Sequence, residues 1–156
     1  QYSIQKIMSK LYLSFVQKSF KYILFLLFLS NLDASKFIEI EKYLTDIEVV
    51  TNYEDRKKGL MFKSSIPQDY GMFFIWPFEK KQCMWMRNTY MPLSVAYINN
   101  EGKILEIYDM VPESERSVCS TKRAKYALEV NKDWFEKNNI NIGDMLSIRS
   151  IVQNDK

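Results

Sequence analysis

The chain has 156 residues, of which 47% are apolar and 26% are charged, and its formal net charge is +3. This length and composition suit one folded domain and exclude a disordered chain. The sequence contains no histidine, which excludes Ser–His–Asp and Cys–His nucleophiles and zinc or haem sites held by histidine. Its four glycines lack the spacing of a phosphate-binding or dinucleotide-binding loop.

The net charge lies in the first 34 residues. Residues 1–34 hold four lysines and one aspartate, which leaves 18 basic and 18 acidic residues in residues 35–156. Lysines precede an uninterrupted apolar octet at residues 22–29, and a polar segment with small residues follows it up to Ala34. This order predicts a signal peptide over residues 1–34, with Met8 as an alternative start. The octet is shorter than the roughly 20 residues of a membrane-spanning helix, so an uncleaved membrane tether is the alternative interpretation.

Beyond residue 34 the sequence predicts a single domain of short strands, because no repeat or linker divides it. Alternating or continuous apolar residues predict strands over residues 37–40, 47–50, 71–76, 83–89, 94–98, 103–110, 124–130 and 145–151. Pro77 should end the third of these strands, because proline lacks an amide donor. Gly102 ends a four-residue turn, so the strands on either side of it should form a hairpin.

Two short helices are expected among these strands. Thr51 and Glu54 have the spacing of a capping box, which predicts a helix that ends near Gly59. Asn131 is placed to cap a second helix over residues 132–138, whose two aromatic residues should face the core. The predicted fold class is therefore α+β and mainly β, with seven or eight short, mostly antiparallel strands, two short helices and closure into a barrel as an option.

Cys83 and Cys119 are the two cysteines of the chain. In an exported protein an even number of cysteines favours a disulfide, whereas in the cytosol both would be small buried side chains. No C-x-x-C motif is present, so a redox function is not expected. Two cysteines without histidine also make a poor zinc site. We therefore expect a structural disulfide and neither a metal nor another cofactor.

Several motifs beyond residue 34 resemble one known family. They are R-x-x-G-L-M at residues 56–61, G-M-F-F at 71–74, W-M-R-N-T-Y-M-P-L at 85–93, D-M-V-P at 109–112, Y-A-L-E at 126–129 and I-G-D at 142–144. In this order they closely resemble domain of unknown function 192, an ancient conserved region of bacteria and archaea, over about residues 37–150. The two cysteines and the aromatic pair 134–135 are similar to its exported proteobacterial branch. The resemblance implies a compact, mainly β domain, often behind a leader peptide, and it supplies no established activity.

The segment that begins at Cys83 holds the candidate ligand site. Trp85 and Arg87 should share one strand face, because side chains alternate along a strand. Together they could stack against a sugar ring or another planar ligand, with Asn88 and Thr89 orienting its hydroxyl groups, and Arg56 on the first helix could contact an anion. The competing interpretation is structural: the tryptophan fills the core, Asn88 and Thr89 cap a loop, and the arginines pair with carboxylates.

Without histidine, general acid–base chemistry would depend on carboxylates. Asp109 follows an apolar strand and Glu129 interrupts another, which makes them the candidate catalytic residues, with Glu106 and Asp144 as further acids. Two carboxylates close together would serve the hydrolysis of an envelope glycan or ester. An ion pair between Glu129 and an arginine would explain the same residue without catalysis.

These patterns favour a non-catalytic, exported or periplasmic binding or accessory domain of the cell envelope. The alternatives are a small carboxylate-dependent hydrolase and a partner protein that offers an edge strand to another envelope protein. Nucleic acid is not an expected partner, because residues 35–156 are neutral and their basic cluster at residues 122–125 is short. We expect a monomer whose ligand or protein partner the sequence leaves unidentified.

Overall fold

The structure is a computed structural model that describes residues 16–17, 21–22 and 35–153. Most of the predicted signal peptide lies outside these residues, so the export signal stays a prediction. The chain divides after Ala34 into two units, and the fold below is that of the second. In the part of the chain that the structure describes, no helix is both long and apolar enough to span a membrane.

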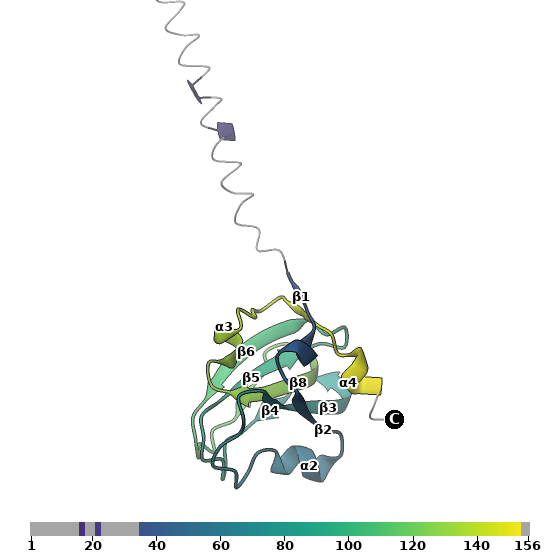
Figure 1. Ribbon diagram of the computed structural model, residues 1–156, viewed down its shortest axis with the longest axis vertical. Coiled ribbons are helices and arrows are strands. Elements are labelled where there is room, and N and C mark those ends of the chain that lie inside the picture. Colours follow the sequence, from purple (N-terminus) through teal and green to yellow (C-terminus); the bar gives the residue numbers. More distant parts are fainter. Residues whose placement is uncertain (1–15, 18–20, 23–34, 154–156) are drawn as a thin grey trace, which may run out of the picture. The chain divides into compact units, whose positions relative to one another are not determined.

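A five-stranded sheet forms the centre of the domain (Figure 1). Its strands, in spatial order, are β2 (Asp46–Val50), β3 (Tyr70–Lys80), β8 (Ala124–Asn131), β5 (Leu93–Ile98) and β6 (Ile104–Met110). β2 pairs with β3 in parallel, and the other three pairings are antiparallel. The mainly β, α+β class is confirmed. The sheet is open, with β2 and β6 as its edges, so the barrel option is not realised.

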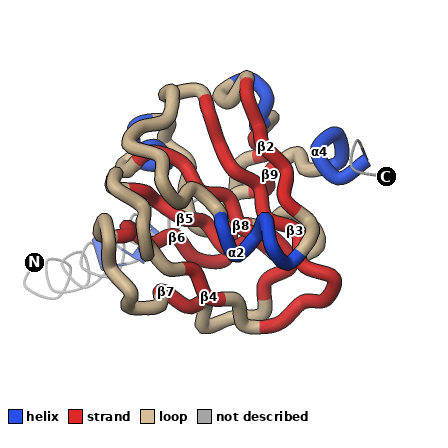
Figure 2. Tube along the Cα trace, turned by 90° about the horizontal axis from the view of Figure 1, so that it is seen from below, coloured by secondary structure: helices blue, strands red, loops and turns tan. Residues whose placement is uncertain are grey.

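Smaller elements surround this sheet (Figure 2). Two short strand pairs are present, the parallel pair β1 (Phe37–Ile38) with β9 (Met145–Leu146) and the antiparallel pair β4 (Cys83–Met84) with β7 (Val118–Cys119). The helices are α2 (Tyr53–Lys58), α3 (Trp134–Lys137) and α4 (Arg149–Gln153), and a 3-10 turn covers Ile40–Lys42. Residues 35–153 thus form nine strands and three α-helices, against the seven or eight strands and two helices expected.

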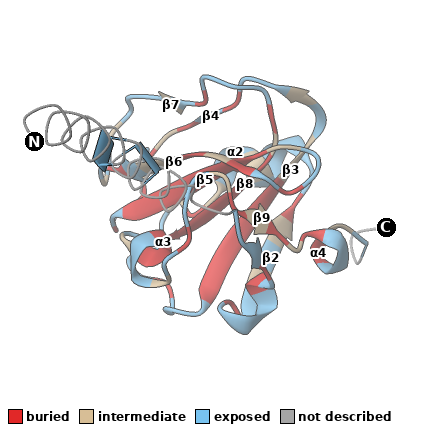
Figure 3. Ribbon diagram, turned by 90° about the horizontal axis from the view of Figure 1, so that it is seen from above, coloured by how far each residue is buried: buried red, intermediate tan, exposed pale blue. Residues whose placement is uncertain are grey.

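Side chains alternate between the two faces of the central sheet and build a hydrophobic core on each. The first core contains Phe73 and Leu128 of the sheet together with residues of α3, α4, β1 and β9. The second core contains Phe74 and Tyr97 together with Leu60, just after α2, and residues of β4. Figure 3 shows the buried strands between these two coverings. The candidate site described below belongs to the second face.

The β5–β6 hairpin forms as predicted. Ser94 lies opposite Asp109 and Val95 opposite Tyr108 in its antiparallel ladder. Gly102 has a φ of 96°, which suits glycine, and an added Cβ would come within 2.5 Å of the carbonyl oxygen of Leu146. The turn is therefore held by both its backbone conformation and its close approach to β9.

The helix predicted from the capping box starts one residue late. Asn52 is the N-cap rather than Thr51, because its side-chain oxygen accepts a hydrogen bond from the amide of Asp55 at 2.9 Å. Asparagine is among the strongest N-cap residues, so it takes this position ahead of threonine. The helix ends at Gly59 as expected, with the glycine at a φ of 47°.

The prediction that Pro77 ends its strand is wrong. β3 continues to Lys80, and its register against β8 shifts between Ile75 and Lys80. A proline is tolerated at such an irregularity, because no ladder hydrogen bond is required of it there. The ammonium group of Lys125 instead donates a hydrogen bond to the carbonyl oxygen of Pro77 at 2.7 Å.

The C-terminal part of the chain differs from its prediction in two places. Asn131 is the last residue of β8 rather than a helix cap, and its amide donates hydrogen bonds to the carbonyl oxygens of Ile66 and Pro67 at 3.3 and 2.9 Å. The strand expected over residues 145–151 ends after two residues, and α4 follows. Ile148 and Ile151, three residues apart, both reach the first core, a spacing that a helical turn satisfies and a strand does not.

Candidate functional site

A pocket of about 360 Å³ opens beside α2, on the second face of the sheet, and we call it the α2 pocket. Aromatic and basic side chains dominate its lining: Tyr53, Phe74, Trp76 and Trp85 on the one hand, Arg56, Lys57, Lys58 and Lys80 on the other. Among the described residues that line it, Glu129 is the single acid. The pocket thus combines apolar ring surface with excess positive charge.

Arg56 fastens α2 to the sheet at the edge of this pocket. Its Nη1 donates a hydrogen bond to the carbonyl oxygen of Ile75 on β3 at 3.0 Å, and another to that of Thr51. Burial lowers the pKa of the guanidinium, which stays charged at neutral pH. Arg56 therefore lines the pocket while holding the helix that supplies Lys57 and Lys58.

The aromatic lining comes from β3 and from the segment after β4. The rings of Phe74 and Trp76 stack with their centroids 5.9 Å apart and their planes 19° apart. Trp85 is half-buried, and the guanidinium of Arg87 lies 5.8 Å from the centre of its ring. Cation–π pairs of this kind orient both partners. The predicted neighbourhood of Trp85 and Arg87 is present, although the strand that holds them is shorter than expected and ends at Met84.

Glu129 lies on β8, in the middle of the sheet, and is 4% exposed. Its strand neighbours are Met72 on β3 and Val95 on β5. The residue lines the α2 pocket, and among the described residues no side-chain oxygen or nitrogen is both fully buried and without a hydrogen-bond partner. Burial raises the pKa of this carboxyl to about 8, so the neutral acid predominates at pH 7. The ion pair with arginine considered from the sequence is not formed.

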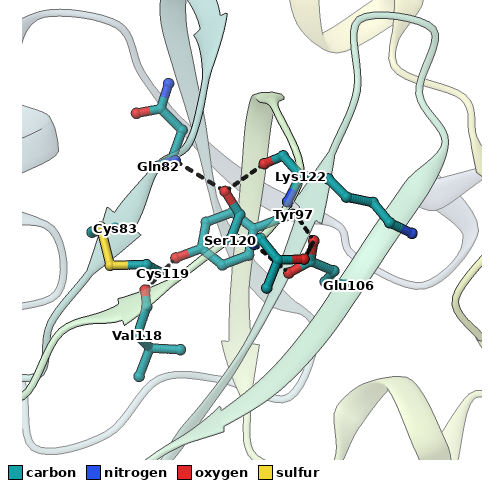
Figure 4. The surroundings of a disulfide bond; sticks show 9 residues. Gln82, Cys83, Tyr97, Glu106, Val118, Cys119, Ser120 and Lys122 are labelled. Atoms are coloured by element: carbon teal, nitrogen blue, oxygen red, sulfur yellow. Dashed lines mark hydrogen bonds between the residues drawn. A yellow bond between two sulfur atoms is a disulfide. The ribbon is translucent and has the colours of Figure 1, made fainter.

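A disulfide joins Cys83, which lines the α2 pocket, to Cys119 (Figure 4). The two residues lie directly opposite each other in the β4–β7 pair. The hydroxyl of Tyr97 donates a hydrogen bond to the carbonyl oxygen of Val118 at 2.6 Å, and the amide of Gln82 donates to the hydroxyl of Ser120 at 3.0 Å. The expected pairing of the cysteines is thus present, and it fixes the strand pair from which Trp85 follows.

The five ligand residues predicted from the sequence divide between two neighbouring depressions. Arg56, Trp85 and Thr89 line the α2 pocket. A second, shallower depression of about 270 Å³, which we call the Arg87 hollow, is lined by Trp85, Arg87 and Asn88 among others. Trp85 belongs to both linings, so all five predicted residues lie around one continuous stretch of surface.

Asn88 and Thr89 also have structural roles in their loop. Asn88 has a φ of 55°, and its carbonyl oxygen accepts a hydrogen bond from the amide of Phe62 at 2.7 Å. Thr89 is 3% exposed, and its carbonyl oxygen accepts one from the amide of Glu113 at 2.9 Å. Their backbones therefore hold the loop together, and each residue also belongs to the lining of one depression.

The two candidate catalytic acids do not meet. Asp109 lies opposite Ser94, whose hydroxyl donates a hydrogen bond to it at 2.6 Å, whereas Glu129 lies opposite Val95. Because Ser94 and Val95 are neighbours on one strand, the two carboxyl groups project from opposite faces of the sheet. Asp109 does not line either depression. The structure therefore leaves Glu129 as the acid beside the aromatic residues.

Some lining residues were not singled out from the sequence. Lys57 and Lys58 follow Arg56 directly, so the run of three basic residues on a short predicted helix was the available signal. Trp76 is the last residue of the predicted strand and Lys80 lies beyond it, and no local pattern placed either beside α2. Within the described residues, no group of three or more Cys, Asp or Glu side chains is placed to hold a metal ion.

Two bacterial proteins of known structure share this fold. A crystal structure of a proposed transcription regulator from Sinorhizobium meliloti 1021 is 32% identical, with a TM-score of 0.62, over 64% of this chain and 78% of that one. A protein of unknown function from Novosphingobium aromaticivorans DSM 12444 is 26% identical, with a TM-score of 0.61, over 64% of this chain and 71% of that one. No curated protein matches the chain significantly.

The family model DUF192, described as "Uncharacterized ACR", matches residues 37–148. This range covers the central sheet and both depressions. The resemblance that the motifs carried is confirmed, and the chain belongs to the DUF192 family.

Proposed function

We propose that this protein is an exported, non-catalytic binding domain of the cell envelope, whose α2 pocket takes an anionic ligand with a sugar-like ring. The observation that carries this proposal is the lining of the α2 pocket, which combines the basic side chains of Arg56, Lys57, Lys58 and Lys80 with the rings of Trp76 and Trp85. A ligand oxyanion in the pocket would be attracted to these basic side chains, and a ring could lie against the indoles.

The charge of the pocket favours an anion. Arg56, Lys57, Lys58 and Lys80 line it, and Glu129 is mostly neutral at pH 7 because its pKa is raised to about 8. A protonated carboxyl group can donate a hydrogen bond to a carboxylate or phosphate oxygen, which an ionised one would repel. The lysines and this neutral acid therefore favour the same kind of ligand.

The aromatic residues favour a ligand with a ring. Pockets that bind small molecules are lined mainly by apolar and aromatic side chains, with a few polar groups that orient the ligand. Trp76 and Trp85 offer ring faces on which the apolar side of a sugar can lie, and Thr89 and Ser117 supply hydroxyl groups in the same lining. Sugar rings that carry a carboxylate or phosphate combine both requirements.

The proposed location rests on the disulfide and on the predicted signal peptide. Disulfides persist in oxidising compartments and are rare in the cytosol, and the Cys83–Cys119 bond is consistent with export. N-terminal sequencing of the mature protein should find a chain that begins near residue 35. A mature chain that begins before Lys21 would contradict the signal peptide and support the membrane tether.

Hydrolysis of an envelope glycan is the second candidate. One observation favours it: the raised pKa of Glu129 would suit a general acid. Glycoside hydrolysis ordinarily uses a second carboxyl group about 5–10 Å away. The one other acid among the described residues of the two linings, Glu54, belongs to the Arg87 hollow rather than to the α2 pocket. A reducing-end assay with polygalacturonate separates the two functions, since a binding domain releases no new ends.

Tryptophan fluorescence can test ligand binding directly. Trp76 and Trp85 line the α2 pocket, whereas Trp134 is buried in the first core across the sheet. Galacturonic acid should change the emission of the wild-type protein and of Trp134→Phe, and galactose, its neutral counterpart, should not. Lys58→Ala should weaken the response to galacturonic acid.

Three results would contradict the proposal. They are an absent response to galacturonic acid and to glucose 6-phosphate, an equal response to galactose, and an unchanged affinity in Lys58→Ala. Arg149→Ala, an exposed substitution on α4 outside both linings, removes one positive charge elsewhere and serves as the matched control.

A further inference from the structure

We infer that the ligand is an acidic oligosaccharide of at least two units, one in the α2 pocket and the next in the Arg87 hollow. This inference rests on the proposed function and specifies the class of ligand. The Arg87 hollow, of about 270 Å³, is lined by Glu54, Lys57, Lys58, Trp85, Arg87 and Asn88, together with Met61. It is a second depression beside the first, and a single sugar ring would not occupy both.

The two depressions are continuous at a shared wall. Lys57, Lys58, Met61 and Trp85 belong to the lining of both. A ligand that extends out of the α2 pocket on this side therefore enters the Arg87 hollow directly, past the indole of Trp85. Ligand sites of drug-sized molecules measure about 300–1,000 Å³, so the hollow alone is small and the two volumes together fall within this range.

Basic side chains recur along this path. We therefore assign a negative charge to each successive sugar unit of the ligand. Lys80 and Arg56 line the α2 pocket alone, Lys57 and Lys58 line both depressions, and Arg87 lines the hollow. A neutral oligosaccharide would need hydroxyl and amide groups rather than this series of cations. An oligosaccharide of acidic sugars suits this row of basic side chains, because each sugar unit brings a carboxylate to the next basic side chain.

Arg87 is free to bind a carboxylate of such an oligosaccharide. It forms an ion pair with Glu115, with an Nε to Oε1 distance of 3.7 Å, and the two side chains are 53% and 74% exposed. Exposed pairs at this distance contribute little to stability, so a ligand carboxylate can replace Glu115 without disturbing the fold. The guanidinium also lies 5.8 Å from the ring of Trp85, at the junction of the two depressions.

Asn88 adds a neutral hydrogen-bonding group to the hollow. Its position is set by the backbone, where a φ of 55° and the hydrogen bond from the amide of Phe62 fix the loop. Asparagine tolerates this left-handed conformation better than most residues. Asn88 is thereby held in the lining of the hollow, and an asparagine amide can both donate to and accept from sugar hydroxyl groups.

Isothermal titration with galacturonic acid and with digalacturonic acid tests the inference. The disaccharide should bind about tenfold or more tightly than the monosaccharide, because it fills both depressions. Arg87→Ala should remove most of that gain and lower the affinity for the monosaccharide much less, because Arg87 lines the hollow alone. Lys80→Ala should weaken both ligands alike, because Lys80 lines the α2 pocket alone.

The control variant is again Arg149→Ala, which should bind both ligands as the wild-type protein does. Equal affinities for the two sugars, or a gain that survives Arg87→Ala, would overturn the inference while leaving the proposed function in place. Failure of both sugars to bind would overturn the proposed function as well. Tighter binding of the dinucleotide pTpT than of digalacturonic acid would also overturn the inference, because it would assign the two depressions to nucleotides.

Discussion

The carboxylate of Glu106 accepts hydrogen bonds from both the amide and the hydroxyl of Thr121, at 2.9 and 2.8 Å. The amide of Lys122 and the hydroxyl of Tyr108 complete its partners at 2.8 and 2.7 Å. These bonds join β6 to the loop that follows the disulfide, as Figure 4 shows in part. Burial acts to raise the pKa of Glu106, but the hydrogen bonds outweigh it and lower the pKa to about 2. An ionised acid thus ties β6 to the loop that follows Cys119.

Glu106→Gln should destabilise the protein at pH 7 by about 1–3 kcal/mol, because an amide replaces an ionised acceptor of several hydrogen bonds. A carboxyl group with a lowered pKa stabilises the fold above its unfolded value and loses this effect as the pH falls. The difference between wild type and variant should therefore shrink from about pH 4.5 to about pH 2. Urea unfolding across this range measures it, and a difference that stays constant would contradict the assignment.

Glu129→Gln should change the pH dependence of stability between about pH 4.5 and about pH 8. The pKa of Glu129 is raised from 4.5 to about 8, so the folded protein keeps a proton that the unfolded chain releases between these values. Stability contributed by the neutral acid is complete below pH 4.5 and is lost as the pH rises toward 8. Wild-type stability should fall across this interval, and the variant should lack this fall. Glu136→Gln, an exposed substitution on α3, should retain the wild-type dependence.

Loss of the disulfide should reduce both stability and ligand affinity. The bond joins residues separated by 36 positions, and the loop-entropy model assigns such a bond about 3–4 kcal/mol. The double variant Cys83→Ser, Cys119→Ser should lose about this much in urea unfolding, and its affinity for galacturonic acid should fall because β4 lines the pocket. Dithiothreitol should lower the stability of the wild type but not of the variant. Equal stability of the two proteins without reductant would be evidence against the bond.

Gly71→Ala should destabilise the fold by about 1–3 kcal/mol through overpacking. An added Cβ would lie 2.6 Å from Cδ1 of Leu44 and 3.0 Å from Cδ1 of Leu128, in the first core. A double-mutant cycle with Leu44→Ala identifies the cause, because removing the leucine side chain should relieve part of the clash. Strictly additive free energies of unfolding would show that the contact with Leu44 is not the source of the cost.

Local features of the fold were predictable because neighbouring residues specify them. The β5–β6 hairpin follows from two apolar strands around a turn that ends in Gly102, and the end of α2 follows from Gly59. Predictions failed where local signals competed. Asn52 caps α2 ahead of Thr51, and Pro77 is tolerated inside β3 because the ladder with β8 is interrupted there.

The sequence alone determined the family, the mainly β class and the residues Arg56, Trp85, Arg87, Asn88 and Thr89 as a candidate ligand group, since motifs and strand patterns are local properties. Only the tertiary structure decided which face of the sheet each acid occupies. That choice depends on the register between strands far apart in the chain, which places Glu129 opposite Val95 and Asp109 opposite Ser94. Tertiary packing also brings Lys80 and Trp76 of β3 beside α2. The charge and shape of the pocket therefore arise from contacts between segments that no local pattern relates.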